Sequence, residues 1–278
     1  MTKRIISTLV LWIVTIICFF YIGPDAAVWL LAVLALSSQY EFYSLLEKMG
    51  RRPFKKFGIF LGGIIIFAPY YANKLELSHA EGVQSGIIAV TIVACCLRIF
   101  RERQVAERIE TLGSTLLGLI YVPFMLGFLV RMIELPGDPK QGLMLVVWLI
   151  VTAKFTDVGA LLVGKAFGRH AMSPITSPKK TWEGAIGGCL VSIGLGFSLT
   201  FFAQEYFPPF FTPLWSTFLA IPITVISIIS DLVESMLKRM ADQKDSGSSI
   251  PGIGGSFDLT DSLILTAPTG YLLFGFLT

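Results

Sequence analysis

Long apolar stretches separated by short polar loops run along the whole chain. A helix needs about 20 apolar residues to cross the hydrocarbon core of a bilayer. The pattern therefore predicts an all-α, polytopic integral membrane protein with about nine transmembrane helices. These helices are expected at residues 5–22, 26–45, 57–73, 83–99, 113–133, 142–163, 184–203, 209–230 and 262–277. The first follows two basic residues, as a signal sequence would, but we expect it to be retained because no small-residue cleavage pattern follows it.

The composition agrees with this prediction and excludes several classes of protein. Of 278 residues, 54% are hydrophobic and 15% are charged. A soluble domain has roughly 45–50% apolar and about 25% charged residues. A water-soluble enzyme, a disordered protein and a secreted cystine-rich scaffold are therefore excluded. The net charge of +3 is too small to indicate a nucleic-acid partner.

Basic residues collect in alternate loops. Lys and Arg gather near the amino terminus and in the segments 48–56, 98–108, 165–180 and 238–244, and they are sparse in the intervening loops. Cytoplasmic loops are enriched in Lys and Arg. We therefore expect the protein in the cell (inner) membrane, with its amino terminus and these loops on the cytoplasmic side and its carboxyl terminus outside.

The two parts of the chain differ in what they contain. Residues 1–112 are predicted to be N-terminal membrane helices, and residues 113–278 a catalytic membrane region. This second region has two long polar loops on the predicted cytoplasmic side, 164–183 and 234–261. We find no internal repeat, so the sequence gives no support to the inverted symmetry of many secondary transporters.

Two ionisable residues, Lys154 and Asp157, lie inside the predicted span 142–163. Charge within a span is costly and usually faces protein or a polar cavity. Their i and i+3 spacing allows a structural ion pair, and a role in a functional site is the alternative. In the next span, we expect Gly184 and Gly188 to allow close helix packing rather than to bind phosphate.

Polar groups also gather where the eighth span ends and the ninth begins. Asp231, Ser235 and Lys238 share one side of the predicted helix. A turn rich in Gly and Pro then leads to Asp258 and Asp261. An aspartate at a helix start is most often a cap. Carboxylates brought together by such a turn also suit Mg²⁺.

The loop before the seventh span, MSPITSPKKTWEGAIGG, has cations and hydroxyls beside a predicted helix amino terminus. Lys179 and Lys180 are followed by Thr181, and Ser177 lies just before them. Such groups bind polyphosphate. Taken without the acidic residues, the loop is explained as well by lysines that only mark a cytoplasmic loop. Together with the acidic groups, the loop indicates metal-assisted phosphate chemistry at the membrane surface.

These segments resemble the CDP-diacylglycerol synthases, also called phosphatidate cytidylyltransferases. The family's carboxyl-terminal signature runs Ser, two residues, Lys-Arg, four residues, Lys-Asp, then a Pro-Gly-His-Gly-Gly turn and Asp-Arg-x-Asp. This chain matches it at Ser235, Lys238, Arg239, Lys244, Asp245, Gly247, Pro251, Gly252, Gly254, Gly255, Asp258 and Asp261. The segments TDVGALLVGKAFGRH and SPKKTWEGAIGG are similar to its middle motifs. Three positions depart from the signature: Ile253 replaces the His, Leu259 the Arg, and Ser256 an apolar residue.

The resemblance implies a reaction of CTP with phosphatidate, in the lipid bilayer, that gives CDP-diacylglycerol and pyrophosphate for phospholipid biosynthesis. The residues expected to be catalytic are Asp231, Asp258, Lys238 and Arg239. Asp231 and Asp258 would hold Mg²⁺, and it stays open whether a monovalent cation such as K⁺ joins it. The residues expected to bind or orient the substrates are Ser177, Lys179, Lys180, Thr181, Ser235, Lys244, Asp245, Asp157 and Asp261. The resemblance also implies a homodimer.

Other functions are compatible with parts of this pattern. A CTP-dependent polyprenol or phytol kinase would share the membrane layout but should lack the carboxyl-terminal signature. A transporter or channel predicts polar residues at mid-membrane in several spans, whereas here they gather at one surface. A non-catalytic membrane relative would explain the replaced His and Arg, but not the retention of Asp231 and Asp258.

Overall fold

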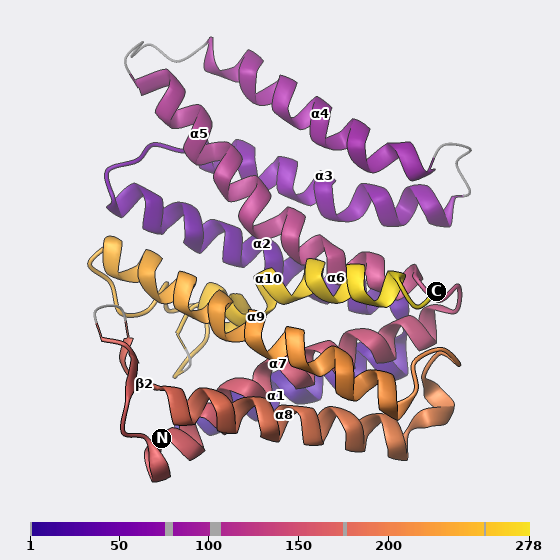
Figure 1. Cartoon of the computed structure of the whole chain (residues 1–278). Coiled ribbons are helices and arrows are strands. Elements are labelled where there is room, and N and C mark those ends of the chain that lie inside the picture. Colours follow the sequence, from indigo (N-terminus) through magenta and orange to yellow (C-terminus); the bar gives the residue numbers. More distant parts are fainter. Residues whose placement is uncertain (1, 76–79, 101–106, 175–176, 253) are drawn as a thin grey trace. The chain divides into compact units, whose positions relative to one another are not determined.

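Helices make up most of the computed structural model of this chain (Figure 1). The structure describes residues 2–75, 80–100, 107–174, 177–252 and 254–278. The elements of the first half are α1 (Thr2–Ile16), the π-helical η1 (Ile17–Ile22), α2 (Pro24–Lys48), α3 (Lys55–Lys74), α4 (Ala80–Ile99), α5 (Arg108–Leu119), the π-helical η3 (Ile120–Phe124) and α6 (Met125–Glu134). Those of the second half are α7 (Pro139–Phe167), β1 (Ala171–Ser173), β2 (Ser177–Thr181), α8 (Trp182–Phe202), η4 (Gln204–Tyr206), α9 (Pro213–Met240) and α10 (Ser256–Gly275).

The predicted spans all overlap helices of the described chain. Four helical stretches of these residues are long and apolar enough to cross a membrane: Arg108–Glu134, Pro139–Phe167, Trp182–Phe202 and Pro213–Met240. The helical membrane architecture is thereby confirmed. The number of nine crossings stays a prediction.

The boundaries of α9 differ from the predicted span. The helix begins at Pro213 rather than at residue 209, and proline is favoured in the first turn of a helix. It continues to Met240, past the expected end at residue 230, because the polar segment that follows still contains good helix formers such as Leu, Glu, Met and Lys. The predicted loop 234–261 is therefore helical at both ends.

A small antiparallel hairpin between α7 and α8 corrects the purely helical expectation. In it, Ala171 of β1 lies opposite Thr181 of β2, and Ser173 lies opposite Ser177. The segment SPITSPKK contains two prolines, which are incompatible with a helix interior. The predicted loop 164–183 is thus a helix end followed by two paired strands.

The chain forms two compact units, each made of two separate segments. Unit 1 combines Met1–Arg131 with Met240–Thr260, and unit 2 combines Met132–Arg239 with Asp261–Thr278. The sequence-based division into N-terminal membrane helices (1–112) and a catalytic membrane region (113–278) is a division by function. The two compact units do not test it, and it stays a prediction.

Buried polar groups link α2 to its neighbours in unit 1. The Gln39 side-chain amide donates to the carbonyl of Gly58 at 3.0 Å. The Tyr43 hydroxyl donates to the carbonyl of Thr115 at 2.8 Å. These bonds join α2 to α3 and α5. Gly58 makes room for Tyr43, because a Cβ at that position would lie 2.8 Å from the tyrosine ring.

In unit 2, α7 packs on α8 through a seam of small residues. A Cβ at Gly188 would lie 2.5 Å from the Thr156 carbonyl oxygen, and a Cβ at Gly184 would lie 2.7 Å from the Ala160 carbonyl oxygen. The prediction that these two glycines allow close helix packing is confirmed. The seam reaches the end of the hairpin, since a Cβ at Gly164 would lie 3.1 Å from the Thr181 hydroxyl.

Candidate active site

Three carboxylates from two helices of unit 2 lie together. Asp231 and Glu234 come from α9 and Asp261 comes from α10, and one oxygen of each lies within 4.8 Å of the others. The Ser230 hydroxyl ties the helices together, because it donates to the Asp261 carbonyl and accepts from the Leu265 N–H at 3.3 Å. Such a set of oxygens is of the kind that holds a divalent cation. The sequence places Glu234 on the same side of this helix as Asp231, but no role as a ligand was predicted for it.

Two of these carboxylates form ion pairs with lysines that were predicted to bind phosphate. Lys180 of β2 pairs with Asp231. Lys238 pairs with Glu234, one turn earlier on α9, at 2.7 Å, and the Glu234 side chain is fully buried. A buried ion pair contributes little net stability, because desolvating the charges costs about as much as their attraction returns. These pairs therefore suit a functional site better than a structural anchor.

The third carboxylate corrects a detail of the sequence analysis. Lys154 of α7 donates to Asp261 at 2.8 Å, whereas the sequence suggested Asp157 as its ion-pair partner. The i and i+3 spacing fixed only that Lys154 and Asp157 share a helix face. The bonding acceptor comes instead from α10, a helix far away in the sequence.

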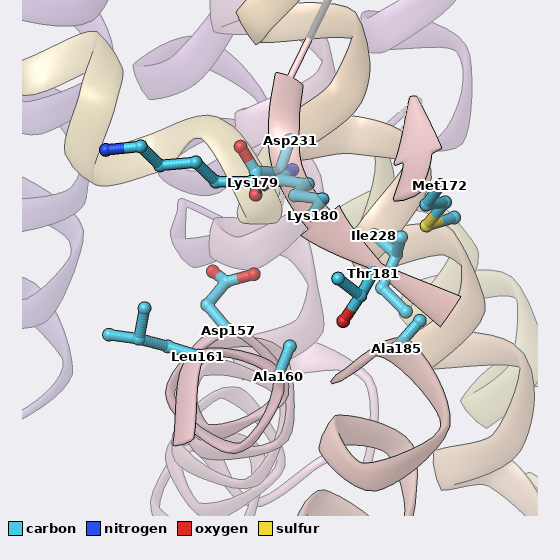
Figure 2. A pocket seen from close by; sticks show the side chains of 10 residues that line it. All are labelled: Asp157, Ala160, Leu161, Met172, Lys179, Lys180, Thr181, Ala185, Ile228 and Asp231. Carbon is cyan, nitrogen blue, oxygen red and sulfur yellow. Dashed lines mark hydrogen bonds and ion pairs between the residues drawn. The ribbon is translucent and has the colours of Figure 1, made fainter. Parts of the chain in front are cut away.

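A cavity of about 270 Å³ is lined by Lys180 and Asp231 together with residues of α7 and α8. In Figure 2, Asp157 points from α7 toward the strand that carries Lys179 and Lys180. The other lining residues are Ala160, Leu161, Met172, Thr181, Ala185 and Ile228. A lining that combines lysines, carboxylates and apolar side chains suits a ligand with both phosphate and hydrocarbon groups.

Several predicted site residues meet around this cavity. Those that line it are Asp157, Lys179, Lys180, Thr181 and Asp231. Lys238 and Asp261 belong to the ion pairs of the acidic cluster. Thr181 has a structural role as well, because its hydroxyl accepts from the Gly184 N–H at 3.1 Å and caps α8.

Three other predicted residues of unit 2 are not among the described residues that line the cavity. Ser177 begins β2, Ser235 is half-buried on α9, and Arg239 is exposed near the end of α9. Their contribution to phosphate binding stays a prediction.

The remaining predicted residues belong to unit 1. Lys244 and Asp245 are exposed after the end of α9. Asp258 lies in the first turn of α10, where its Oδ2 accepts from the Ser246 N–H at 2.9 Å and the Gly255 N–H at 2.7 Å and lies 2.8 Å from the Ser246 hydroxyl oxygen. The helix-capping alternative is thus confirmed for Asp258. Its role as a metal ligand stays a prediction.

Two of the positions that depart from the family signature, Ser256 and Leu259, lie at this helix start. Ile253 lies outside the described residues. Ser256 is buried and Leu259 is half-buried in the first turn of α10. The Leu259 N–H donates to the Gly255 carbonyl at 3.3 Å. Replacing the family Arg by Leu therefore leaves the first turn intact.

Sequence reasoning also missed Glu41 of α2. Its side chain is buried, with only 4% of the residue exposed. The carboxylate accepts from the Ser246 hydroxyl at 2.9 Å, the Ser249 hydroxyl at 2.5 Å and the Phe257 N–H at 2.9 Å. The signal was present, because an acidic residue inside the predicted span 26–45 is costly without a partner.

Comparison with known proteins identifies what this sequence is similar to. A sequence profile described as "Cytidylyltransferase family" matches residues 2–277. A phosphatidate cytidylyltransferase of Haemophilus influenzae is 36% identical over 148 residues, which cover 53% of this chain and 51% of that protein. One of Bacillus subtilis is 30% identical over 213 residues, covering 77% of each chain. One of Synechocystis is 28% identical over 299 aligned positions, covering 97% of this chain and 95% of that protein. The chain thus matches about half the length of the first relative and nearly all of the third.

Proposed function

This chain belongs to the cytidylyltransferase family, and from that membership we infer that it transfers a cytidylyl group from CTP to phosphatidate. The products are CDP-diacylglycerol and pyrophosphate, and the reaction serves phospholipid biosynthesis. The observation that carries this inference is the cavity of unit 2, whose lining combines two lysines and two aspartates with apolar side chains. A nucleoside triphosphate and a lipid phosphate together require a lining of this kind.

The reaction sets a simple electrostatic demand on the protein. An oxygen of the phosphatidate attacks the α-phosphorus of CTP in line, one P–O bond forms, and the bond to pyrophosphate breaks. Both reactants are anionic, so cations must offset their repulsion. Lys179 and Lys180 supply two positive charges at the cavity. Lys180 is held by Asp231, and a phosphate oxygen would compete for the same ammonium group. No nucleophilic side chain is needed.

The acidic cluster fits a divalent cation. Asp231, Glu234 and Asp261 offer three carboxylate oxygens within 4.8 Å of one another, and Mg²⁺ prefers oxygen ligands. Asp231 is common to this set and to the pair predicted from the sequence, Asp231 and Asp258. When bound, Mg²⁺ would neutralise phosphate charge and stabilise the leaving pyrophosphate. A monovalent cation such as K⁺ would be a second ion beside Mg²⁺ in this proposal, and its effect on the reaction rate can be measured.

The lipid substrate reaches the cavity from the bilayer in this proposal. Leu161 lines the cavity and is 54% exposed. Leu162 on α7 and Ile186 on α8 are also exposed, and exposed apolar side chains on such helices suit contact with acyl chains. The positive-inside pattern favours the cytoplasmic side of the inner membrane for the cavity, where CTP is available. The family resemblance favours a homodimer.

Pyrophosphate release by the purified, detergent-solubilised chain tests the function. The reaction contains CTP, phosphatidate and Mg²⁺, and separate controls omit the lipid or the metal. We expect release only when all three are present, with CDP-diacylglycerol formed in equal amount. Adding K⁺ to the complete reaction measures any contribution of a monovalent cation.

The products also separate the alternatives. A CTP-dependent polyprenol or phytol kinase would release CDP rather than pyrophosphate, and it would require the prenol or phytol in place of phosphatidate. A transporter or a non-catalytic relative would release neither product. Either result from folded protein would contradict the proposed function.

A further inference from the structure

The segment that joins α9 to α10 is attached to α2 by one buried carboxylate. We name this segment the signature loop; its described residues are 241–252, 254 and 255. Glu41 accepts hydrogen bonds from the hydroxyls of Ser246 and Ser249 in the loop. It also accepts from the N–H of Phe257 just after it. All three donors come from one short stretch of chain, so the position of Glu41 constrains where Ser246, Ser249 and the start of α10 lie.

Ser246 connects this anchor to the first aspartate of α10. Its hydroxyl oxygen lies 2.9 Å from Glu41 Oε2 and 2.8 Å from Asp258 Oδ2. Its N–H donates to the same Asp258 oxygen at 2.9 Å. Any displacement of Ser246 would therefore be transmitted to the Asp258 carboxylate.

Two signature glycines accommodate the buried acid. A Cβ at Gly247 would lie 2.5 Å from Glu41 Oε1, and a Cβ at Gly255 would collide with the other oxygen of the carboxylate and with Ser246. The loop backbone therefore approaches Glu41 more closely than any other residue type would allow. This close approach lets the Phe257 N–H and two hydroxyls reach one carboxylate.

Burial of the Glu41 carboxylate has a desolvation cost that its hydrogen bonds must offset. A buried carboxylate is costly unless hydrogen bonds compensate for its lost hydration. Here the compensation comes from two hydroxyls of the signature loop and the Phe257 N–H just after it, so a loop that moved away would leave the acid without its hydroxyl donors. An apolar residue at position 41 would fill the same space without that cost. A buried acid with these partners is therefore suited to fixing geometry.

We propose that Glu41 is a positioning residue, which fixes the signature loop and, through Ser246, the carboxylate of Asp258. This inference rests on the proposed function, in which Asp258 takes part in the reaction. It gives the amino-terminal helices a role in catalysis, because α2 determines how a carboxyl-terminal motif is held. Groups that support metal-binding or catalytic side chains typically cost about 10- to 100-fold in affinity or activity when they are removed.

The test compares Glu41→Gln with a matched control on the same helix, Tyr43→Phe. Glu41→Gln keeps the size of the side chain but removes its negative charge and replaces one acceptor oxygen by an NH₂ group, which cannot accept from the Phe257 N–H or from a serine hydroxyl. Tyr43→Phe removes the buried hydrogen bond to Thr115 without touching the loop. We expect Glu41→Gln to lower kcat by about 10- to 100-fold and to raise the Mg²⁺ concentration that gives half-maximal activity. Tyr43→Phe should retain the parent values of both.

A second readout does not depend on activity. Lys244 is exposed in the signature loop, and trypsin cleavage after it should become faster in Glu41→Gln and in Ser246→Ala but not in Tyr43→Phe. Parent kcat, Mg²⁺ requirement and cleavage rate in Glu41→Gln would overturn the proposal, and so would equal losses in Glu41→Gln and Tyr43→Phe. An inactive parent chain would contradict the proposed function instead, and the cleavage rates would still show whether Glu41 holds the loop.

Discussion

The two units hold their carboxylates in different ways. In unit 2, Asp231, Glu234 and Asp261 are compensated by lysine side chains from β2, α9 and α7. In unit 1, Glu41 and Asp258 are compensated by hydroxyls and backbone N–H groups of the signature loop and the first turn of α10. A lysine ammonium can exchange one anionic partner for another, because its side chain is long and flexible. A backbone N–H can move only if the chain moves. The first arrangement therefore suits a site that exchanges ions and phosphates, and the second suits a fixed support.

Removing a carboxylate of the acidic cluster in unit 2 should have the largest effect on turnover. We expect Asp231→Asn to lower kcat on the order of 10³-fold, because it removes a predicted metal ligand and the partner of Lys180. Pyrophosphate release measures the rate, and size-exclusion chromatography with thermal unfolding in detergent shows whether the variant is folded. A folded Asp231→Asn variant with near-parent activity would remove this residue from the catalytic set.

Asp258→Asn provides the corresponding test in unit 1. If Asp258 binds the metal, turnover should fall about as far as in Asp231→Asn, on the order of 10³-fold, while the protein remains folded and inserted. If Asp258 only caps α10, the loss should appear as lower thermal stability, typically by about 1 kcal/mol for a cap. Near-normal activity in this variant would therefore contradict its assignment as a metal ligand.

Neutralising the hairpin lysine should have the next largest effect. Lys180→Gln should lower kcat/KM for CTP by about 10²-fold, because one charge that offsets the phosphates is lost. Lys165→Gln is the matched control, since Lys165 is an exposed lysine near the end of α7 and does not line the cavity. Equal losses in the two variants would indicate a general effect of surface charge rather than phosphate binding at the hairpin.

A smaller effect is expected from the seam between α7 and α8. Gly188→Ala places a methyl group 2.5 Å from the Thr156 carbonyl oxygen, and overpacking of this kind costs about 1–3 kcal/mol. Gly194→Ala on the same helix is the control, because its Cβ would meet nothing within 4 Å. Thermal unfolding in detergent should separate the two variants. Equal unfolding temperatures would show that α7 and α8 accommodate the added methyl group without loss of stability.

Topology can be tested with substitutions that should leave the activity unchanged. In a variant without the four native cysteines, Ala171→Cys in β1 and Glu205→Cys in η4 provide exposed sites on either side of α8. A membrane-impermeant thiol reagent should label them from opposite sides of the bilayer. Labelling from the same side would refute the predicted orientation of α8.

The hydrophobic pattern predicted which segments are helical better than it predicted where they end. Hydropathy reports where a chain can be buried in lipid, whereas a helix continues for as long as its residues favour it. For that reason α9 extends to Met240 beyond its apolar part. The hairpin between α7 and α8 was missed because two short, polar strands have no hydrophobic period that would reveal them.

The candidate site was predictable where the chemistry is local in sequence. The spacing of Lys179, Lys180 and Thr181 identified the hairpin side of the cavity, and all three residues line it. Partners that are distant in sequence were not predictable. Lys154 bonds Asp261, 107 residues away, and Glu41 bonds Ser246, 205 residues away. A single sequence shows that a buried charge needs a partner, but it does not show which residue the fold supplies.

The contact between Glu41 and Gly255 has a consequence for how this sequence can change. A side chain at position 255 would collide with the Glu41 carboxylate, so a larger residue there is compatible only with a shorter one at position 41. A shorter residue at 41 in turn gives up the hydrogen bonds that hold Ser246 and Phe257. A substitution at either position alone is therefore expected to be harmful. Only a simultaneous change of both residues could lead to a different functional arrangement. In chains that keep this loop, an acid at position 41 and a glycine at position 255 should therefore be inherited as a pair.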